Sequence, residues 1–207
     1  MFKTDLTPRT PGLLSLPEDL IIERMLTDDV PAVMAVDRLC FPTPWSENAY
    51  RSEMGNVSAH YLVARLPARA GRAGAAREGR LVGFAGGWIV MDEAHITTIG
   101  VHPDYRRRGI GEQLFTALLE EARARGVRRA TLEVRESNRG AQSLYAKYGF
   151  VPIARRRRYY SDTDEDAIVM WVEDLQSGMR DEGRGMRENG SLVGTHPSSL
   201  IPHPSDR

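Results

Sequence analysis

The chain has 207 residues, of which 41% are hydrophobic, and its 28 basic residues balance its 28 acidic residues. This length suits one ordinary domain with a single packed core and some excess at the ends. The balanced charge argues against a general polyanion binder, so nucleic acid is not an expected partner. The single cysteine, Cys40, excludes an internal disulfide and fits the reducing cytosol. We expect a cytoplasmic protein without a membrane partner, because no segment reaches the roughly 18 apolar residues of a spanning helix.

Hydrophobic periodicity and turn residues divide the first half of the chain into strands and helices. The run from Phe41 to Ser46 separates two helices, because its prolines remove backbone donors and restrict the residues before them. A segment over 67–79, rich in alanine, glycine and arginine, is expected to be a solvated hairpin loop. In chain order the expected elements are a strand over 20–25, a helix from Asp28 or Asp29 toward Leu39, a helix from Ser46, and strands over 60–66, 81–90 and 94–101.

The second half contains the most regular helical pattern, in which Leu114, Leu118 and Ala122 recur on one face. The pattern is mixed α/β, with a strand, turn, helix, strand unit at its centre. The expected elements are a helix over 111–126, a strand over 129–135, a helix over 139–148, and strands over 150–153 and 167–172. A flexible lead-in over 1–17 and a disordered tail over 176–207 are expected around one domain over 18–175.

A glycine-rich turn, Arg106-Arg107-Arg108-Gly109-Ile110-Gly111, follows the strand that ends at Val101. Glycine allows positive φ, and the first turn of a helix presents unpaired N–H groups, so such a turn can bind phosphate. The same residues also suit an ordinary tight turn with exposed arginines. Neither the Gly-Lys-Ser/Thr motif nor the three-glycine dinucleotide fingerprint is present.

The sequences on either side of this turn help to decide between a phosphate-binding turn and an ordinary tight turn. The chain reads Ile-Gly-Val-His-Pro-Asp-Tyr over 99–105, Leu-Glu-Val-Arg-Glu-Ser-Asn over 132–138 and Leu-Tyr-Ala-Lys-Tyr-Gly-Phe over 144–150. Together with the turn, these motifs resemble the GCN5-related N-acetyltransferase (GNAT) superfamily. Within it they resemble the RimI type, which acetylates alanine at the N-terminus of a ribosomal protein. The resemblance covers about residues 20–173.

The resemblance implies the GNAT fold, a mixed, mostly antiparallel sheet with central splayed parallel strands flanked by helices. It also implies acetyl-CoA as co-substrate, with the pantetheine arm beside Ile99 to Val101 and the pyrophosphate at the glycine-rich turn. Gly100 stands where the family has a small apolar residue such as alanine. The residues expected to bind the cofactor are Ile99, Gly100, Val101, Arg106, Arg107, Arg108, Gly109, Ile110, Gly111, Glu112 and Asn138.

A carboxylate lies within the strand expected over 129–135. The two-residue period of a strand puts Thr131, Glu133 and Arg135 on one face and Leu132 and Val134 on the other. Taken alone, Glu133 reads as a salt-bridged residue on a sheet face. The resemblance implies that it is the general base, which accepts the proton of the acceptor amine through a water.

Asn138, Gln142 and Tyr145 recur at helical spacing and therefore share a face that can look into the cleft. Asn138 is well placed to cap the helix, a role compatible with a cofactor contact. Tyr145 alone reads as a partner for Phe150, but its phenol can also donate a proton to a departing thiolate. The resemblance implies that Tyr145 is the general acid.

The remaining steps need an oxyanion site and a direct route for the acetyl group. The backbone N–H of Val101 is the candidate oxyanion donor, because a fixed amide dipole costs no reorganisation. Cys40 has no evident histidine partner and reads as a buried cysteine, so a route through an acyl-cysteine ranks lower. No cluster has metal-ligand spacing, and we expect no metal.

The acceptor amine is the least determined part of the prediction. An α-amine, with a reference pKa of about 8, loses its proton more easily than a lysine at about 10.4, which favours an N-terminus for a single glutamate base. The resemblance implies that Trp45 and Tyr160 flank the peptide, although Thr43 is additional to the family's Phe-Pro-Trp-Ser run. A tryptophan after a proline is also typical of a packing staple, and arginines 155–158 of a solvated face.

Three functions stay open on the sequence alone. The first is acetylation of a protein N-terminus, with an alanine-starting ribosomal protein as the partner. The second is acetylation of a small amine or a lysine side chain. The third is a non-catalytic acyl-CoA sensor, against which the joint presence of Glu133 and Tyr145 argues. We expect a monomer or weak dimer.

Overall fold

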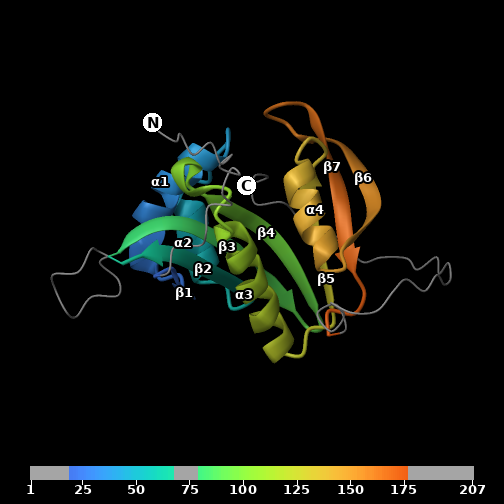
Figure 1. Cartoon of the computed structure of the whole chain (residues 1–207), viewed down its shortest axis with the longest axis horizontal. Coiled ribbons are helices and arrows are strands. Elements are labelled where there is room, and N and C mark those ends of the chain that lie inside the picture. Colours follow the sequence, from blue (N-terminus) through green and yellow to red (C-terminus); the bar gives the residue numbers. More distant parts are fainter. Residues whose placement is uncertain (1–18, 68–78, 177–207) are drawn as a thin grey trace, which may run out of the picture.

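The structure, a computed structural model, describes residues 19–67 and 79–176 (Figure 1). The expected lead-in over 1–17, nearly all of the expected loop over 67–79 and the expected tail lie outside the described residues. Among the described helices, none combines the length and the apolar character needed to cross a membrane.

Seven strands form one mixed sheet in the order β1-β2-β3-β4-β5-β7-β6. All neighbouring strands are antiparallel except β4 and β5, which are parallel. The expected mixed α/β class, with a mostly antiparallel sheet and a central parallel pair, is confirmed. The strands are β1 (Ile21–Arg24), β2 (Ala59–Leu66), β3 (Arg80–Val90), β4 (Glu93–Val101), β5 (Arg129–Arg135), β6 (Val151–Tyr160) and β7 (Glu165–Val172).

Helices cover both faces of this sheet, as alternate residues of β2 show. Leu62 belongs to a core cluster that joins α3 to β2, β3, β4 and β5. Tyr61 and Val63 belong to a second cluster, which joins α1 and α2 to β2 and β3. Because neighbouring strand residues point to opposite faces, α3 lies on one face and α1 and α2 lie on the other. The helices are α1 (Val30–Cys40), α2 (Glu47–Met54), α3 (Ile110–Ala124) and α4 (Arg139–Lys147), with 3-10 turns over Thr27–Asp29 and Pro103–Tyr105.

The two parallel strands pair at their beginnings and then diverge (Figure 1). Their register ends at Ile96↔Leu132. Directly afterwards β4 bulges at Thr97, which is an extra residue relative to β3. A bulge bends its strand and increases its twist. The splayed centre implied by the resemblance is therefore present, and β4 from Thr98 onward is not paired with β5.

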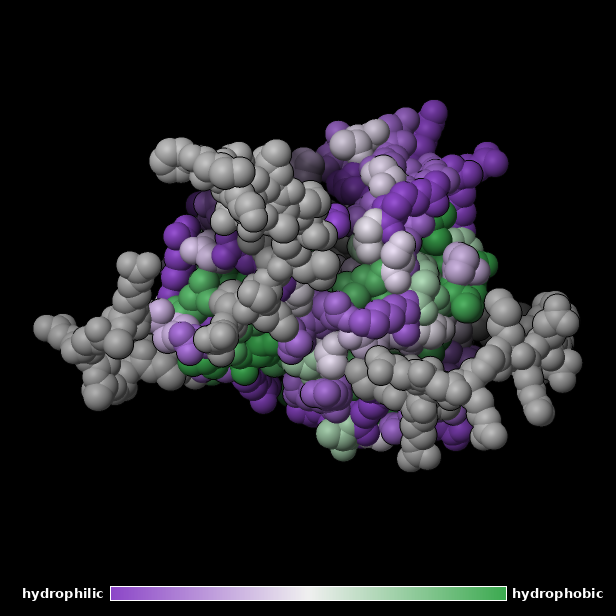
Figure 2. Space-filling view, in the orientation of Figure 1, coloured by the Kyte–Doolittle hydropathy of each residue, from purple (hydrophilic) through white to green (hydrophobic). Residues whose placement is uncertain are grey.

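β6 is longer than the sequence predicted, because it runs to Tyr160 and not only over 150–153. It is an edge strand of the sheet and most of its residues are exposed, so its arginines show no apolar alternation. Pairing with β7, for example Arg156↔Ala167, continues the strand instead. Figure 2 shows the resulting hydrophilic surface over the β6 and β7 end of the molecule.

A side chain caps the start of α2, but none caps the start of α1. Ser46 caps α2, because its hydroxyl accepts a hydrogen bond of 3.1 Å from the N–H of Ala49. Asp29 precedes α1 but makes no side-chain cap. Its carboxylate accepts the N–H of Leu26 at 2.8 Å and pairs with the buried Arg65. A buried guanidinium needs a carboxylate partner, and this demand directs Asp29 away from the helix.

Candidate active site

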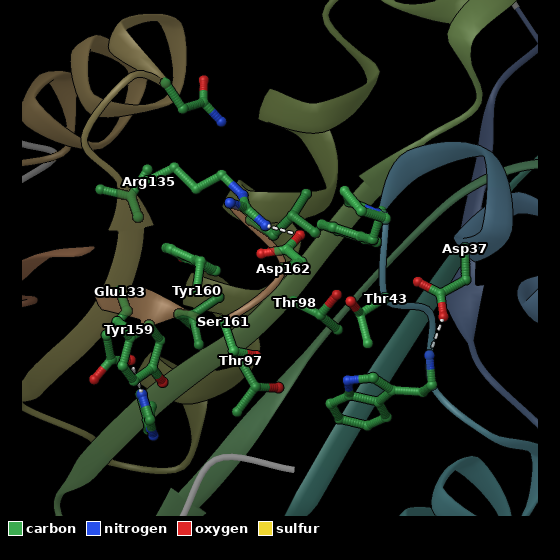
Figure 3. A pocket seen from close by; sticks show the side chains of 18 of the residues that line it. Asp37, Thr43, Thr97, Thr98, Glu133, Arg135, Tyr159, Tyr160, Ser161 and Asp162 are labelled. Atoms are coloured by element: carbon green, nitrogen blue, oxygen red, sulfur yellow. Dashed lines mark hydrogen bonds and ion pairs between the residues drawn. The ribbon is translucent and has the colours of Figure 1, made fainter. Parts of the chain in front are cut away.

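A cavity of about 200 Å³ opens where β4 and β5 diverge. Figure 3 shows Glu133 and Tyr160 on one side of it and Asp37 and Thr43 on the other, with Thr97 on the strand between them. The cavity brings together six of the residues that the sequence predicted: Trp45, Ile99, Glu133, Asn138, Tyr145 and Tyr160. These residues come from five separate segments of the chain, and the divergence of the parallel strands is what lets them meet.

Glu133 faces the cavity from β5 and contacts a histidine and an arginine. Its side chain is only 6% exposed. One carboxylate oxygen lies 2.6 Å from Nε2 of His95, and the other lies 3.2 Å from the guanidinium of Arg156. The prediction that Glu133 is salt-bridged therefore describes its contacts correctly. The same residue also lines the cavity.

Sequence reasoning missed both partners of Glu133. His95 is opposite Thr131 in the parallel register, on the same face as Glu133. That position follows from the register of β4 against β5, which composition and periodicity do not give. Arg156 lies in the part of β6 that was not predicted as a strand.

Tyr145 lines the cavity from α4 and packs on aromatic rings. Its ring centroid is 5.0 Å from that of Phe115 and 6.3 Å from that of Phe150, so the expected contact with Phe150 exists. Burial raises the pKa of its phenol to about 12. The hydroxyl therefore keeps its proton throughout the physiological range, as a proton donor must.

Asn138 and Gln142 share a face of α4 but make different contacts. The side chain of Asn138 accepts the N–H of Ala141 at 3.1 Å, so it caps α4 and also lines the cavity. The amide of Gln142 donates instead to the carbonyls of Arg135 and Glu136, at 3.0 and 2.9 Å. Gln142 thus ties α4 to the end of β5, and the prediction that it looks into the cleft is wrong.

The diverging edge of β4 carries backbone groups that are not paired with β3. The N–H of His102 donates to Val82 on β3 at 2.9 Å. Because backbone groups point to alternate sides along a strand, those of Ile99 and Val101 point away from β3. The carbonyl of Val101 accepts Nε of Arg106 at 3.1 Å, which folds the turn back onto the strand.

Cys40, at the end of α1, also donates to the carbonyl of Val101, at 3.3 Å. The thiol is half-buried. Burial raises its pKa, so the nucleophilic thiolate is disfavoured at neutral pH. This environment agrees with the low rank of an acyl-cysteine route.

Gly100 is explained by packing. A Cβ at this position would lie 2.6 Å from the ring of Phe84, which is fully buried. The absence of alanine here is therefore a consequence of the size and position of Phe84.

The glycine-rich turn lies beyond the cavity lining, at the start of α3. Arg107 and Gly109 have positive φ values of 62° and 78°. Gly109 directly precedes the first residue of α3, whose initial N–H groups have no partner within the helix. A Cβ on Gly111 would make only an ordinary contact of 3.6 Å with Val101. The left-handed conformation therefore requires glycine at position 109 and not at position 111.

Glu112 in the first turn of α3 points toward α4. Its carboxylate accepts Nζ of Lys147 at 2.6 Å and the hydroxyl of Tyr148 at 3.0 Å. The hydrogen bond from Lys147 lowers the pKa of Glu112. The side chain of Glu112 thus joins the two helices. Of this residue, only the backbone N–H at the start of α3 is left to face a bound cofactor.

Trp45 packs against other aromatic rings and also lines the cavity. Its ring lies 5.2 Å from that of Tyr50 and 6.3 Å from that of Tyr61, which is the packing expected of a staple. It also lines the cavity, together with the additional residue Thr43. Thr43, which is additional to the family's Phe-Pro-Trp-Ser run, therefore lies in the wall of the cavity.

The turn between β6 and β7 closes the far side of the cavity. Arg135 holds it through an ion pair of 2.6 Å with Asp162 and by lying 3.9 Å above the ring of Tyr160 (Figure 3). Arg155, Arg157 and Arg158 are exposed, as expected of a solvated face, and three members of the run also form ion pairs. Arg155 pairs with Glu136 and Asp166, Arg156 with Glu133, and Arg158 with Asp164.

The cavity is thus equipped for proton transfer. It holds a buried carboxylate, an imidazole and a protonated phenol beside an exposed backbone edge. Within residues 19–67 and 79–176, no three side chains are arranged to hold a metal ion. Acid–base chemistry beside an extended ligand is what these groups suit.

Comparison with known proteins defines the class to which this fold and site belong. Residues 30–150 match the acetyltransferase (GNAT) family. The chain belongs to this family, and the expectation of an N-acetyltransferase is confirmed.

Among its relatives is the ribosomal protein bS18-alanine N-acetyltransferase of Escherichia coli, which is 38% identical over 151 residues, 72% of this chain and 94% of that protein. The N-alpha-acetyltransferase RimI of Mycobacterium tuberculosis is 39% identical over 61% of this chain and 74% of that protein. The crystal structure of the E. coli ribosomal-protein-S18-alanine N-acetyltransferase superposes with a TM-score of 0.64 at 32% identity, covering 81% of this chain and 99% of that one. The resemblance to the RimI type is therefore confirmed.

Proposed function

We propose that this protein transfers the acetyl group of acetyl-CoA to the α-amine of an alanine at the N-terminus of ribosomal protein bS18. The names of its relatives support the acceptor. The observation that carries the proposal is the meeting of Glu133 and Tyr145 in one cavity beside the diverging edge of β4. A cytoplasmic location and a single catalytic domain over 18–175 belong to the same proposal.

Glu133 is the general base in this proposal. The acceptor arrives as an ammonium and attacks only after losing a proton, which Glu133 accepts directly or through a water. Its burial matters, because a carboxylate in a poorly hydrated cavity interacts strongly with a nearby ammonium. The free amine then attacks the carbonyl carbon of the thioester.

The tetrahedral intermediate carries negative charge on the former carbonyl oxygen. The N–H of Val101, which points away from β3, is the donor we assign to this oxygen. Collapse of the intermediate breaks the carbon–sulfur bond. Tyr145, protonated at neutral pH, then gives its proton to the departing thiolate and leaves CoA as a thiol. The nitrogen of the new amide loses its extra proton, which restores the phenol of Tyr145.

The residues of this chain suit acetyl-CoA as the donor. The backbone of Ile99 and Val101 offers an extended arm the hydrogen bonds of an added strand. The start of α3 presents unpaired N–H groups after Gly109 to the pyrophosphate, where the helix dipole favours negative charge. Arg107 and Arg108 add positive charge at the same turn. Bound acetyl-CoA supplies the activated acetyl group.

The acceptor site is formed by the loop over 41–46 and the turn between β6 and β7. Trp45 and Tyr160 line the cavity from these two segments, and we assign the slot for the first residue to the space between them. A narrow slot suits a small first residue such as alanine. A lone glutamate base favours an α-amine over lysine, because the α-amine has the lower pKa.

The test compares acceptors on the full chain. Steady-state rates are measured with a peptide of the bS18 N-terminus, the same peptide with its α-amine blocked and a lysine free, spermidine and an aminoglycoside. The expected result is acetylation of the first peptide alone, located at the α-amine by mass spectrometry. Faster acetylation of the blocked peptide or of the small amines would overturn the acceptor assignment. If none of the four acceptors were acetylated, the assignment of acetyltransferase activity would be wrong.

A further inference from the structure

His95 lies at the point where the two central strands separate. It is on β4 opposite Thr131, one position before the last register pair of β4 and β5, Ile96↔Leu132. Glu133 follows that pair on β5 and shares the face of Thr131. The 2.6 Å contact between Nε2 of His95 and the Glu133 carboxylate therefore bridges the two strands just where their backbone pairing ends.

Both side chains of this contact are nearly buried, with 10% exposed for His95 and 6% for Glu133. A carboxylate only accepts hydrogen bonds, so Nε2 carries the proton and donates it. Nδ1 of His95 is buried and has no hydrogen-bond partner among the described residues. A proton on Nδ1 would therefore lack an acceptor, and the neutral ring that donates through Nε2 fits the site.

The imidazole ring is also held from its other side. The ring of Trp88 packs edge-on against it at 5.9 Å. The indole N–H of Trp88 donates in turn to Glu53 at 2.5 Å, which fixes the tryptophan. His95 is thus clamped between a packed indole and the carboxylate, so its donor direction is set by the core.

The second partner of Glu133 is of a different kind. Arg156 reaches the other carboxylate oxygen from the edge strand β6 and is 35% exposed, so water competes for this ion pair. Tyr160, also from β6, is close enough to Glu133 that, besides burial, the charge of this carboxylate raises the pKa of its phenol. From β7 the residue opposite Glu133 is the apolar Val169. His95 is therefore a buried, geometrically fixed donor to this carboxylate.

We propose that His95 is a positioning residue that holds the Glu133 carboxylate ionised and in one orientation in the cavity. The inference rests on the proposed role of Glu133 as base. A hydrogen bond to the charged form of an acid favours that form, so His95 extends the pH range in which Glu133 can accept a proton. It also prevents the carboxylate from rotating away from the acceptor.

The test uses His95→Leu, which removes the donor, and His95→Gln, which restores an N–H donor of similar reach. His60→Leu is the matched control, because His60 is 4% exposed and contacts Glu121 at 3.1 Å outside the cavity. Rates are measured from pH 5 to 9 with the bS18 peptide. The midpoint of the Glu133 carboxyl titration is followed by carbon-13 NMR, assigned with Glu133→Gln.

His95→Leu is expected to lower kcat by about ten- to a hundredfold, the loss typical of a hydrogen bond to a charged group. The acid limb of kcat/KM and the NMR midpoint should both move up by about one pH unit or more. KM for acetyl-CoA should stay the same, and His95→Gln should recover most of the rate. His60→Leu should leave the limb and the midpoint unchanged.

A His95→Leu enzyme with the wild-type acid limb and NMR midpoint would overturn the inference, even if its rate fell together with that of His60→Leu. In that case Glu133→Gln would still be inactive and the proposed function would stand. A wild-type protein that transfers no acetyl group would overturn both, whatever the titration of Glu133.

Discussion

The carboxylate of Asp37, near the end of α1, accepts a hydrogen bond of 2.8 Å from the backbone N–H of Trp45. Tyr50 from α2 also hydrogen-bonds to this carboxylate, and Asp37 is only 1% exposed. The contact fixes the loop over 41–46 against the helix. It thereby sets the position of Thr43 and Trp45 in the cavity wall.

Replacing Asp37 should therefore impair the acceptor site more than the cofactor site. Asp37→Ala leaves the N–H of Trp45 without its acceptor, and we expect a loss of about 1–3 kcal/mol in the free energy of unfolding. KM for the peptide should rise while acetyl-CoA affinity stays the same. Asp37→Asn keeps an acceptor for Trp45 and is the control. Denaturant titration and steady-state kinetics check this, and equal effects on both substrates would contradict it.

The hydroxyl of Tyr145 can be removed without disturbing its ring. Tyr145→Phe keeps the contacts with Phe115 and Phe150, so the melting temperature should change little. Turnover should fall by about a hundredfold or more if the phenol is the general acid. In the wild type, the pKa of about 12 keeps the phenol protonated, so no loss of rate below about pH 11 should arise from this group. Full activity of Tyr145→Phe would remove the assignment.

Two glycines of the phosphate turn should respond differently to alanine. Gly109→Ala forces a side chain into a φ of 78°, and we expect a loss of about 1–2 kcal/mol in stability together with weaker acetyl-CoA binding. Gly111→Ala makes only an ordinary contact and should be nearly neutral for stability. Thermal unfolding and calorimetry with acetyl-CoA distinguish the two variants. A Gly109→Ala protein with wild-type stability and affinity would contradict the role of this turn.

The ion pair between Glu112 on α3 and Lys147 on α4 should make the free energy of unfolding depend on pH. The pKa of Glu112 is lower in the folded protein than its ordinary value of 4.5, so its stabilising effect is complete above that value and disappears as the pH falls through the lowered pKa. Lys147→Ala should cost about 0.5 kcal/mol at pH 7, as is usual for an exposed pair. The difference should vanish well below pH 4. Urea titrations at several pH values test this, and a difference independent of pH would refute it.

The sequence alone predicted the elements whose bounds depend on nearby residues, such as helix-ending glycines and strand alternation. α3 ends at Ala124 and α4 at Lys147, and each is followed two residues later by a glycine with positive φ, Gly126 at 82° and Gly149 at 85°. β5 has the predicted bounds, because its alternation of Leu132 and Val134 with polar residues is regular. β6 was only partly predicted, since an edge strand needs no apolar face.

The residues of the candidate site were predicted where a motif or segment resembles the family. Glu133, Asn138 and Tyr145 lie in such motifs, and all three line the cavity. His95 and Asp37 lie in none. Their roles depend on the register of β4 against β5 and on the packing of α1 against a loop, which are tertiary contacts between distant segments.

The most direct test of the central claim is the single-turnover rate of acetyl transfer to the bS18 peptide by wild-type protein and Glu133→Gln, measured with acetyl-CoA bound in both. If Glu133 accepts the amine proton, the variant binds acetyl-CoA with wild-type affinity but transfers about a hundredfold more slowly. A variant that binds acetyl-CoA and acetylates alanine at the wild-type rate would show that the base lies elsewhere.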